Sequence, residues 1–502
     1  MSKVTIKRLQ TGVAGLDLIL GGGLPEFSFN LLGGKPGCGK TTLAHQLMFA
    51  MASVERPALY FTVLGEPALK MLRYQQQFDF FVTGKLNDAI SFVNLSEEAA
   101  EGDLDKVGKR IASEVQARGP GLVFIDSFRS VVRSASAREN RQQQFMQELG
   151  MLLTSWQATT FLVGEYSGEQ DANPIVTLAD GLIWLHQSVQ RNSMVRKIEI
   201  LKMRGQAILP GLHTFRIASS GLTIFPPAQE ASEGVGERGN EAGNDSSGKR
   251  SGAAPKKRLS MGLPALDQML GGGLPRGYSL LVAGPSGSGK TILASRFLAE
   301  GARVGETGVV AVFEQDPHRS QNRLLANLID AGKVGLIDSR SPDLSIDEIV
   351  LEIMTEIRRL SATRVVIDSL SGFEMSVAPT FQQDYRESMA RMVNALARTG
   401  VTVLMTSELE DRYSDLRFSP YGTAFLTDAI IVQRYVEIDS RLQRLMAVVK
   451  VRGSAHSDEL RLFRIDGEGL HLGETLAEHQ GLLTGRPSRK HVELPPPSSR
   501  RA

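Results

Sequence analysis

Short apolar runs alternate with longer amphipathic stretches along most of the chain. In the first half, the apolar runs predict buried strands at Leu31–Leu32, Ala58–Val63, Ile90–Leu95, Leu122–Ile125 and Thr159–Val163. Between them, apolar residues recur at spacings of three and four, which predicts helices over Thr41–Ser53, Ala68–Gln77, Leu104–Ala117 and Gln142–Trp156. A strand, helix, strand rhythm predicts an α/β fold with a mainly parallel sheet and helices on both faces.

The rhythm changes late in each half of the chain, where strands follow one another without a helix between them. These strands are predicted at Gly181–His186, Val195–Met203, Ala429–Val436 and Leu445–Val451. Consecutive strands of this kind pair as hairpins, so each half is expected to carry a β extension at one edge of its sheet.

The sequence contains an internal repeat, in which the same motifs occur once in each half of the chain. Gly21-Gly22-Gly23-Leu24-Pro25 returns as Gly271-Gly272-Gly273-Leu274-Pro275, a shift of 250 positions, and Lys202-Met203-Arg204 returns as Lys450-Val451-Arg452. An internal repeat of this length indicates two copies of one domain. We therefore expect a first domain over residues 1–225 and a second over residues 258–485.

Two segments differ in composition from these domains. Residues 226–257 are rich in Gly, Ser, Ala, Glu, Asn and Lys, and residues 486–502 carry Pro495-Pro496-Pro497 between basic pairs. Such segments bury too little apolar area to offset the entropy of ordering. The sequence predicts a flexible linker and a disordered basic tail, with a partner-binding peptide as the alternative for the tail.

Composition excludes several classes of protein. Hydrophobic residues make up 42% of the chain, and 57 Lys plus Arg balance 55 Asp plus Glu to a net charge of +2. No overall field therefore attracts nucleic acid or an anionic membrane. A single cysteine, Cys38, excludes a disulfide framework and argues against a structural zinc site. Without a secretion signal or a long apolar span, we expect a soluble cytoplasmic protein.

Each copy contains the G-x-x-x-x-G-K-[ST] pattern of a phosphate-binding loop, at 34–41 and at 284–291. The glycines let successive backbone N–H groups converge on phosphate oxygens, and the lysine reaches the β and γ phosphates. Two matches in register within a repeat make chance agreement negligible. The residues expected around ATP are Gly34, Gly37, Cys38, Gly39, Lys40, Thr41 and Thr42, and Gly284, Ser286, Gly287, Ser288, Gly289, Lys290, Thr291 and Ile292.

An acid follows a buried strand in both copies. Asp126 comes after Leu122-Val123-Phe124-Ile125, and Asp368 comes after Val365-Val366-Ile367. Alone, such an acid is usually an ordinary strand end, but next to a P-loop it is the residue that orients Mg²⁺ and its waters. The predicted metal ligands are Thr41, Asp126, Thr291 and Asp368.

These features together resemble the circadian clock KaiC family of the RecA-like superfamily. The tandem Gly-Gly-Gly-Leu-Pro lead-in, the P-loop, the strand-end Asp-Ser and the late Lys-x-Arg occur in the same order in residues 3–225 and 258–480. The resemblance implies a hexamer of two stacked rings with ATP at the subunit interfaces. It also implies slow hydrolysis in one ring and autophosphorylation in the other.

The Lys-x-Arg pairs, Lys202 with Arg204 and Lys450 with Arg452, each point off one face of a predicted strand. In the family, the matching pairs cross the interface and stabilise charge on the neighbour's ATP, so a catalytic role in trans is expected. The alternative is a solvated pair on an edge strand.

The two copies differ at the catalytic base. In the family, two successive glutamates follow the strand after the P-loop helix, where a carboxylate positions water or accepts a proton. The second copy keeps Glu314 and has Gln315 next to it, whereas the first copy has Leu64-Gly65 with Glu66 displaced by one residue. We expect the first domain to bind ATP and hydrolyse it poorly, with Lys40 and Lys290 binding phosphate in each domain.

The phosphate-acceptor positions of the family also differ here. They fall on Ala424 and Phe425, neither of which can be phosphorylated, although Ser419, Tyr421 and Thr423 lie nearby. Autokinase activity by the family route is therefore doubtful, and the nearby hydroxyls are equally explained as turn residues.

The sequence favours an oligomeric, KaiC-like, Mg²⁺-dependent ATPase switch with unidentified signalling partners and a more active second domain. A non-catalytic scaffold held together by ATP is the first alternative, favoured by the lost acids of the first copy and opposed by Glu314. A RecA-like enzyme acting on DNA is weaker, because aromatic residues make up only 6% of the chain and the net charge is near zero.

Overall fold

The computed structural model describes residues 6–62, 68–101, 103–127, 139–165, 174–190, 193–227, 257–314, 317–318, 323–338, 344–377, 381, 385–409, 426–467, 469–475, 479–482 and 488–489. The chain divides into two compact units, Met1–Glu237 and Arg238–Ala502. Among the residues just given, no helix is long and apolar enough to cross a membrane.

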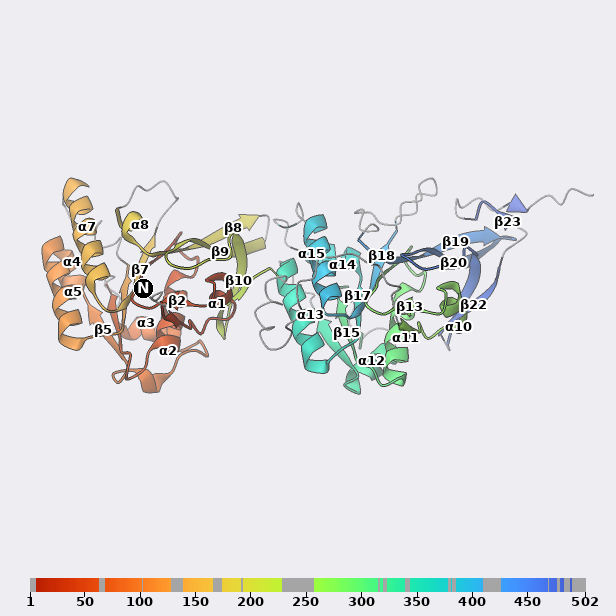
Figure 1. The fold of residues 1–502 in the computed structure, drawn as a ribbon, viewed down its shortest axis with the longest axis horizontal. Helices are drawn as coiled ribbons and strands as arrows, with labels where there is room; N and C mark the ends of the chain where they lie inside the picture. Colours follow the sequence, from red (N-terminus) through yellow and green to blue (C-terminus); the bar gives the residue numbers. More distant parts are fainter. Residues whose placement is uncertain are drawn as a thin grey trace, which may run out of the picture. The chain divides into compact units, whose positions relative to one another are not determined.

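The first unit, drawn in red to yellow-green in Figure 1, contains a nine-stranded sheet. Its strand order is β5-β4-β6-β7-β3-β8-β9-β10-β11. The strands from β5 to β8 run parallel, and β8 to β11 are antiparallel. The strands are β1 (Arg8–Leu9), β2 (Leu24–Pro25), β3 (Phe29–Gly34), β4 (Ala58–Thr62), β5 (Ile90–Asn94), β6 (Leu122–Asp126), β7 (Thr159–Glu165), β8 (Gly181–Gln190), β9 (Ser193–Met203), β10 (Leu212–Ala218) and β11 (Gly221–Phe225). The helices are α1 (Leu16–Ile19), α2 (Lys40–Met51), α3 (Ala68–Gln75), η1 (Thr83–Lys85), α4 (Ser96–Ala100), α5 (Leu104–Arg118), α7 (Glu139–Ser155) and α8 (Pro174–Leu178).

The second unit repeats this topology in the order β16-β15-β17-β18-β14-β19-β20-β21-β22. Its strands are β12 (Arg258–Leu259), β13 (Leu274–Pro275), β14 (Ser279–Gly284), β15 (Gly308–Val312), β16 (Val334–Asp338), β17 (Arg364–Asp368), β18 (Thr402–Glu408), β19 (Ala429–Ile438), β20 (Arg441–Val451), β21 (Arg461–Asp466), β22 (Gly469–Thr475), β23 (His479–Gln480) and β24 (Ser488–Arg489). Its helices are α10 (Pro264–Met269), α11 (Lys290–Arg303), α12 (Arg323–Asp330), α13 (Ile346–Leu360), α14 (Leu370–Ser376) and α15 (Tyr385–Arg398).

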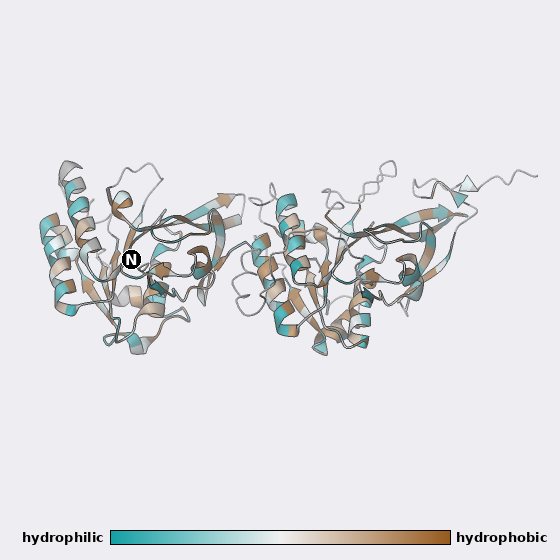
Figure 2. Ribbon diagram, in the orientation of Figure 1, coloured by the Kyte–Doolittle hydropathy of each residue, from teal (hydrophilic) through white to brown (hydrophobic). Residues whose placement is uncertain are grey.

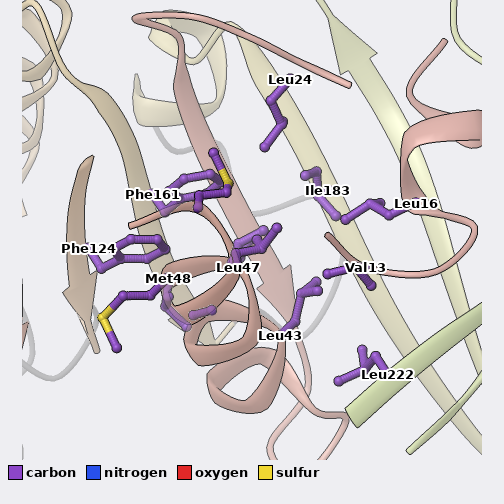
Figure 3. Close-up of a cluster of buried hydrophobic side chains, with 14 of the residues drawn as sticks. Val13, Leu16, Leu24, Leu43, Leu47, Met48, Phe124, Phe161, Ile183 and Leu222 are labelled. Atoms are coloured by element: carbon purple, nitrogen blue, oxygen red, sulfur yellow. The ribbon is translucent and has the colours of Figure 1, made fainter. Parts of the chain in front are cut away.

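Both the α/β fold class and the late β extension are confirmed. Alternate residues of the central strands face opposite sides of the sheet, so each side has its own apolar layer. Tyr60, Phe124 and Phe161 pack with α2 on one side, and Phe61 and Ile125 pack with the helices α5 and α7 on the other. Figure 3 shows the first layer, and Figure 2 shows the apolar strands between helices with hydrophilic outer surfaces.

Local sequence explains where the outer helices begin and end. In α5, the buried residues Leu104, Val107, Ile111 and Val115 recur at spacings of three and four, which forms one apolar stripe. The Asp103 side chain accepts hydrogen bonds from two backbone N–H groups at its start, and Gly119 ends the helix with φ 55°. In α13, the Ser345 side chain caps the start in the same way.

The segments predicted as linker and tail fall mostly outside the described residues. Residues 228–256 and 490–502 are among those not described. Within the predicted tail, Ser488–Arg489 forms the strand β24, which pairs with β23. The domain boundaries at 225, 258 and 485 remain predictions.

Candidate nucleotide-binding sites

Both P-loops connect a central strand to the start of a helix, β3 to α2 and β14 to α11. The glycines just before the two helices, Gly39 and Gly289, have φ 106° and 102°, a conformation that strains any residue with a side chain. A side chain at Gly34 would place its Cβ 2.2 Å from the Leu185 carbonyl oxygen, whereas one at Gly37 would meet nothing within 4 Å. The loop is therefore closed toward the sheet and open on its outer side, as a phosphate cradle requires.

The P-loop lysines bend back onto carbonyl groups of their own loops. Lys40 Nζ donates to the Lys35 carbonyl at 2.8 Å, and Lys290 Nζ donates to the carbonyls of Gly284 and Pro285 at 2.9 and 2.8 Å. Burial lowers the pKa of Lys290, and the nearby acids Glu408, Asp368 and Glu314 oppose this shift. A lysine held here can exchange these carbonyls for phosphate oxygens.

The predicted magnesium ligands come together in both copies. Thr41 Oγ1 donates to Asp126 Oδ2 at 2.9 Å, and Thr291 hydrogen-bonds Asp368 in the same way. Burial raises the pKa of both carboxyl groups, and these hydrogen bonds oppose the rise. One hydroxyl and one carboxylate fit Mg²⁺, which takes oxygen ligands and obtains the others from phosphate and water.

A second hydrogen-bond donor for each of these aspartates was not expected from the sequence. The Tyr60 hydroxyl on β4 donates to Asp126 Oδ2 at 2.9 Å, whereas the Thr406 hydroxyl on β18 donates to Asp368 Oδ1. The two donors come from strands on opposite sides of the aspartate's own strand. Only the pairing of strands far apart in sequence brings them there, so no local pattern identifies them.

Glu314 lies just after β15 and contacts the segment that follows Asp368. The Ser369 hydroxyl donates to Glu314 Oε1, and it also accepts a hydrogen bond from the Gly372 N–H at 3.0 Å. A Cβ at Gly372 would lie 2.5 Å from Glu314 Cγ, so only glycine leaves room for this glutamate. The carboxylate is therefore fixed in place beside the predicted metal ligand.

These groups surround one cavity of about 320 Å³ in the second unit. Three acids, Glu314, Asp368 and Glu408, line it together with apolar residues of α11, β15 and α12. The predicted nucleotide-binding residues that line it are Ser286, Gly287, Gly289, Lys290, Thr291 and Ile292. Glu408 was missed, because a glutamate at a strand end has no distinctive local pattern.

Two other predicted loop residues turn their side chains toward the sheet. Ser288 is 1% exposed and donates to Gln433 Oε1 on β19 at 2.9 Å. Cys38, the matching residue of the first copy, is fully buried next to Gly34, and burial raises the pKa of its thiol. These side chains fill space behind the loop, and Thr42 is half-buried in the first turn of α2.

The Lys-x-Arg pairs lie at the ends of β9 and β20. Lys202 Nζ donates to the Thr177 carbonyl at 3.2 Å and Arg204 pairs with Asp180 at 3.1 Å. Lys450 Nζ likewise donates to the Thr427 carbonyl at 2.6 Å, and Arg452 lies 3.4 Å from Asp428. The side chains of Arg204 and Arg452 are 56% and 62% exposed. Each Lys-x-Arg pair is therefore bound to its own domain on one side, while its arginine is open to solvent on the other.

The repeated glycine lead-in supports the loop after each Lys-x-Arg pair. A Cβ at Gly21 would lie 2.0 Å from the Ala207 carbonyl oxygen, and one at Gly271 would lie 2.6 Å from that of Ala455. The Ser457 N–H also donates to the Met269 carbonyl at 2.8 Å. The glycines are needed for this close approach of two chain segments.

Two groups of predicted residues fall outside the described residues. The first group lies at or next to the predicted position of the catalytic base and comprises Leu64, Gly65 and Glu66 of the first copy and Gln315 of the second. The second group is the acceptor region with Ser419, Tyr421, Thr423, Ala424 and Phe425.

Comparison with known proteins agrees with the geometry. The family model "ATPase: KaiC" matches residues 9–229 and 259–477. The circadian clock oscillator protein KaiC of Picosynechococcus sp. is 25% identical over 505 residues, covering 97% of this chain and 94% of its own. KaiC 1 of Synechocystis sp. is 25% identical, covering 97% and 93%, and KaiC of Parasynechococcus marenigrum is 25% identical, covering 97% and 94%. With the family model covering most of both repeats, the chain belongs to the KaiC ATPase family.

Proposed function

We propose that the protein is an ATP-hydrolysing oligomeric switch with one nucleotide site in each domain, of which the second is the more active. The observation that carries this proposal is the cavity of the second unit, where Lys290, Thr291, Asp368 and Glu314 converge. In this assignment Lys40 and Lys290 bind the β and γ phosphates, and the P-loop N–H groups bind the remaining phosphate oxygens.

In the proposed reaction, Glu314 orients the attacking water and accepts its proton. Ser369 holds that carboxylate, and Gly372 leaves space for it. Mg²⁺, held through Thr291 and Asp368, would supply charge neutralisation on the phosphates. Thr41 and Asp126 form the corresponding set in the first domain, which we assign mainly to ATP binding.

The proposed oligomer is a ring, of six subunits by family analogy, in which Lys202, Arg204, Lys450 and Arg452 reach a neighbour's ATP. The exposure of the two arginines and the repetition of the pair in both copies support this assignment. Cytoplasmic localisation and signalling protein partners follow from the similarity to clock proteins and belong to the same proposal.

Hydrolysis and autophosphorylation are distinguished by one experiment. The full chain is mixed with γ-labelled ATP and Mg²⁺, and ADP, free phosphate and protein-bound phosphate are followed in a single turnover. We expect ADP and free phosphate to appear together, and Glu314→Gln to slow both by about 10² to 10⁴-fold, the usual contribution of a positioned base.

Three outcomes would contradict the proposal. Unchanged turnover in Glu314→Gln, with turnover lost in Lys40→Ala, would make the first domain the active one. If the parent chain and every variant bind ATP without hydrolysing it, the result would support the non-catalytic scaffold instead. Stoichiometric phosphate within residues 415–428, read by mass spectrometry and lost in Glu314→Gln, would restore an autokinase.

A further inference from the structure

Glu408 lies next to the start of the second P-loop and has no role in the reaction proposed above. It is the last residue of β18 and is opposite Gly284, the first residue of the loop, in the parallel pairing of β14 and β18. The next residue, Leu409, donates its N–H to the Gly284 carbonyl at 3.1 Å. The backbone of Glu408 is therefore fixed relative to the loop that binds phosphate.

Glu314 and Glu408 approach the cavity from opposite sides of Asp368. Asp368 ends the strand β17, which lies between β15, followed by Glu314, and β18, which ends at Glu408. All three acids line the cavity with Lys290. Two carboxylates that flank the metal-binding acid can contact the same small molecule between them.

The negative charge already present in this cavity means that Glu408 weakens ATP binding. Such a residue is disadvantageous unless it takes part in the reaction. Among the described residues that line the cavity, three carboxylates face one lysine, and a triphosphate brings further negative charge to the same place. Asp368 is balanced by the predicted metal ion, and Glu314 accepts a hydrogen bond from Ser369. A third acid near the γ phosphate opposes ATP binding by repulsion between like charges.

The same position is acidic in the first copy. Glu165 ends β7 opposite Gly34, as Glu408 ends β18 opposite Gly284. Glu165 is close enough to Asp126 to raise the pKa of that carboxyl group. The first copy has no acid at the position that matches Glu314, but it has Glu165 at the position that matches Glu408. The acid at the end of the strand beside the P-loop is therefore common to both copies, and the proposed catalytic base is not.

We propose that Glu408 is a second water-positioning carboxylate for ATP hydrolysis in the second domain, an inference that rests on the proposed function. The water oxygen forms a bond to the γ phosphorus as the bond from that phosphorus to the β–γ bridging oxygen breaks. The bond's electron pair leaves on ADP. Glu314 accepts one water proton and later releases it to solvent, while Glu408 accepts a hydrogen bond from the other O–H.

The test uses Glu408→Gln in the full chain, because glutamine keeps the shape of the side chain and removes its charge. Turnover is measured at saturating ATP, and affinity is measured with a fluorescent N-methylanthraniloyl ATP. We expect kcat of the second domain to fall by about tenfold or more, with the dissociation constant unchanged or lower. A residue that only maintained the loop would weaken binding as well.

Two controls make the result specific. Glu437→Gln removes an exposed acid from β19, which is separated from β18 by β14 in the same sheet, and Glu437 does not line the cavity, so the change should affect neither quantity. Lys290→Ala gives the turnover that belongs to the first domain, which is subtracted from each rate.

The outcomes separate the inference from the proposed function. If Glu314→Gln loses turnover and Glu408→Gln keeps the kcat of the parent chain, the role of Glu408 is wrong and the proposed function stands. If kcat and affinity fall together in Glu408→Gln, the residue supports nucleotide binding and the inference is also overturned. If Glu314→Gln keeps full turnover, the proposed function itself fails.

Discussion

His45 and Tyr60 form a buried pair next to Asp126, the predicted metal ligand of the first domain. Their ring centroids are 4.7 Å apart, and the Tyr60 hydroxyl donates to Asp126. Burial lowers the pKa of His45 from 6.5 to about 4 and raises that of Tyr60. Both side chains are therefore neutral at pH 7, and the first domain carries a histidine that resists protonation.

This histidine should make the first domain sensitive to mild acid. The pKa of His45 is about 4 in the folded chain and 6.5 in the unfolded chain. Below pH 6.5 the unfolded chain therefore takes up a proton on this histidine that the folded chain does not. Stability is full above pH 6.5 and falls as the pH drops toward 4. At pH 5 the first domain should have lost about 2 kcal/mol relative to pH 7. Scanning calorimetry of the full chain between pH 7 and 5 measures this loss.

His45→Gln provides the comparison for the acid effect. The substitution should lower stability at pH 7, because the buried ring is lost, but it should flatten the dependence on pH. Ser295 replaces the histidine at the matching position of the second domain, whose transition serves as an internal reference. Equal pH slopes in the parent chain and His45→Gln would contradict the assignment.

At the scale of elements, the strand next to each P-loop supports it differently in the two copies. In the second unit, Gln433 on β19 accepts a hydrogen bond from Ser288, and the Tyr435 hydroxyl lies 3.4 Å from the Ser286 carbonyl. In the first unit, Cys38 and Leu185 lie together behind Gly34. A polar pair in one copy thus occupies the place of an apolar pair in the other.

We predict that Ser288 and Gln433 are energetically coupled. Gln433→Leu leaves the buried Ser288 hydroxyl without its acceptor, which should cost about 1 to 3 kcal/mol. Adding Ser288→Ala should recover part of that loss, because the double variant resembles the apolar pair of the first copy. Urea unfolding of the four proteins gives the coupling energy.

A matched control for this cycle is Gln443→Leu on the neighbouring strand β20. Its effect should add to that of Ser288→Ala without coupling, because Gln443 pairs with Val436 rather than with the P-loop. Additive effects of Ser288→Ala and Gln433→Leu would show that the hydrogen bond contributes nothing to the loop's stability.

Sequence periodicity predicted most elements of the first unit to within a few residues. The strand expected at Leu122–Ile125 is Leu122–Asp126, and the helix expected at Leu104–Ala117 is Leu104–Arg118. Local pattern suffices there because the repeating side-chain spacing itself creates the buried face. The P-loops were also predictable, since their chemistry requires fixed residue types at short spacing. Asp126 and Asp368 were predictable because each directly follows an uninterrupted apolar run, whereas Thr406 and Ser407 interrupt the apolar run before Glu408.

The remaining parts of the site depend on contacts between distant segments. Tyr60, Thr406, Glu408 and Gln433 reach the predicted nucleotide-binding residues only through strand order and register. Ser369 contacts Glu314 across 55 positions of sequence. A single sequence gives no periodic signal for such contacts, so their roles appear only after the sheet is assembled.

At the scale of the whole molecule, the Lys-x-Arg pairs link the proposed catalysis to assembly. Arg204 and Arg452 are bound at one side by Asp180 and Asp428 of their own domains, and more than half of each side chain is exposed. An ion pair at such exposure contributes little stability to the subunit itself. The guanidinium groups are therefore available to a phosphate of another subunit at small cost.

The final prediction is that ATP drives assembly through these arginines. A γ phosphate bound by one subunit's P-loop and another's Lys-x-Arg contributes attraction only when both are present. Sedimentation should therefore give larger species with ATP than with ADP or without nucleotide. Arg452→Ala should weaken assembly or turnover while the affinity of the dilute subunit for fluorescent ATP stays nearly unchanged, and Arg204→Ala should act likewise.

Arg441→Ala tests whether the effect belongs to the Lys-x-Arg position or to any positive charge on the strand. Arg441 is exposed at the opposite end of β20, so it carries the same charge on the same element, away from the end that bears Lys450 and Arg452. A general loss of charge would weaken assembly equally in both variants and would diminish at high salt. If the arginine acts on a neighbour's γ phosphate, Arg452→Ala should remove the difference between ATP and ADP, and Arg441→Ala should leave that difference unchanged. A monomer under all three nucleotide conditions would exclude the ring.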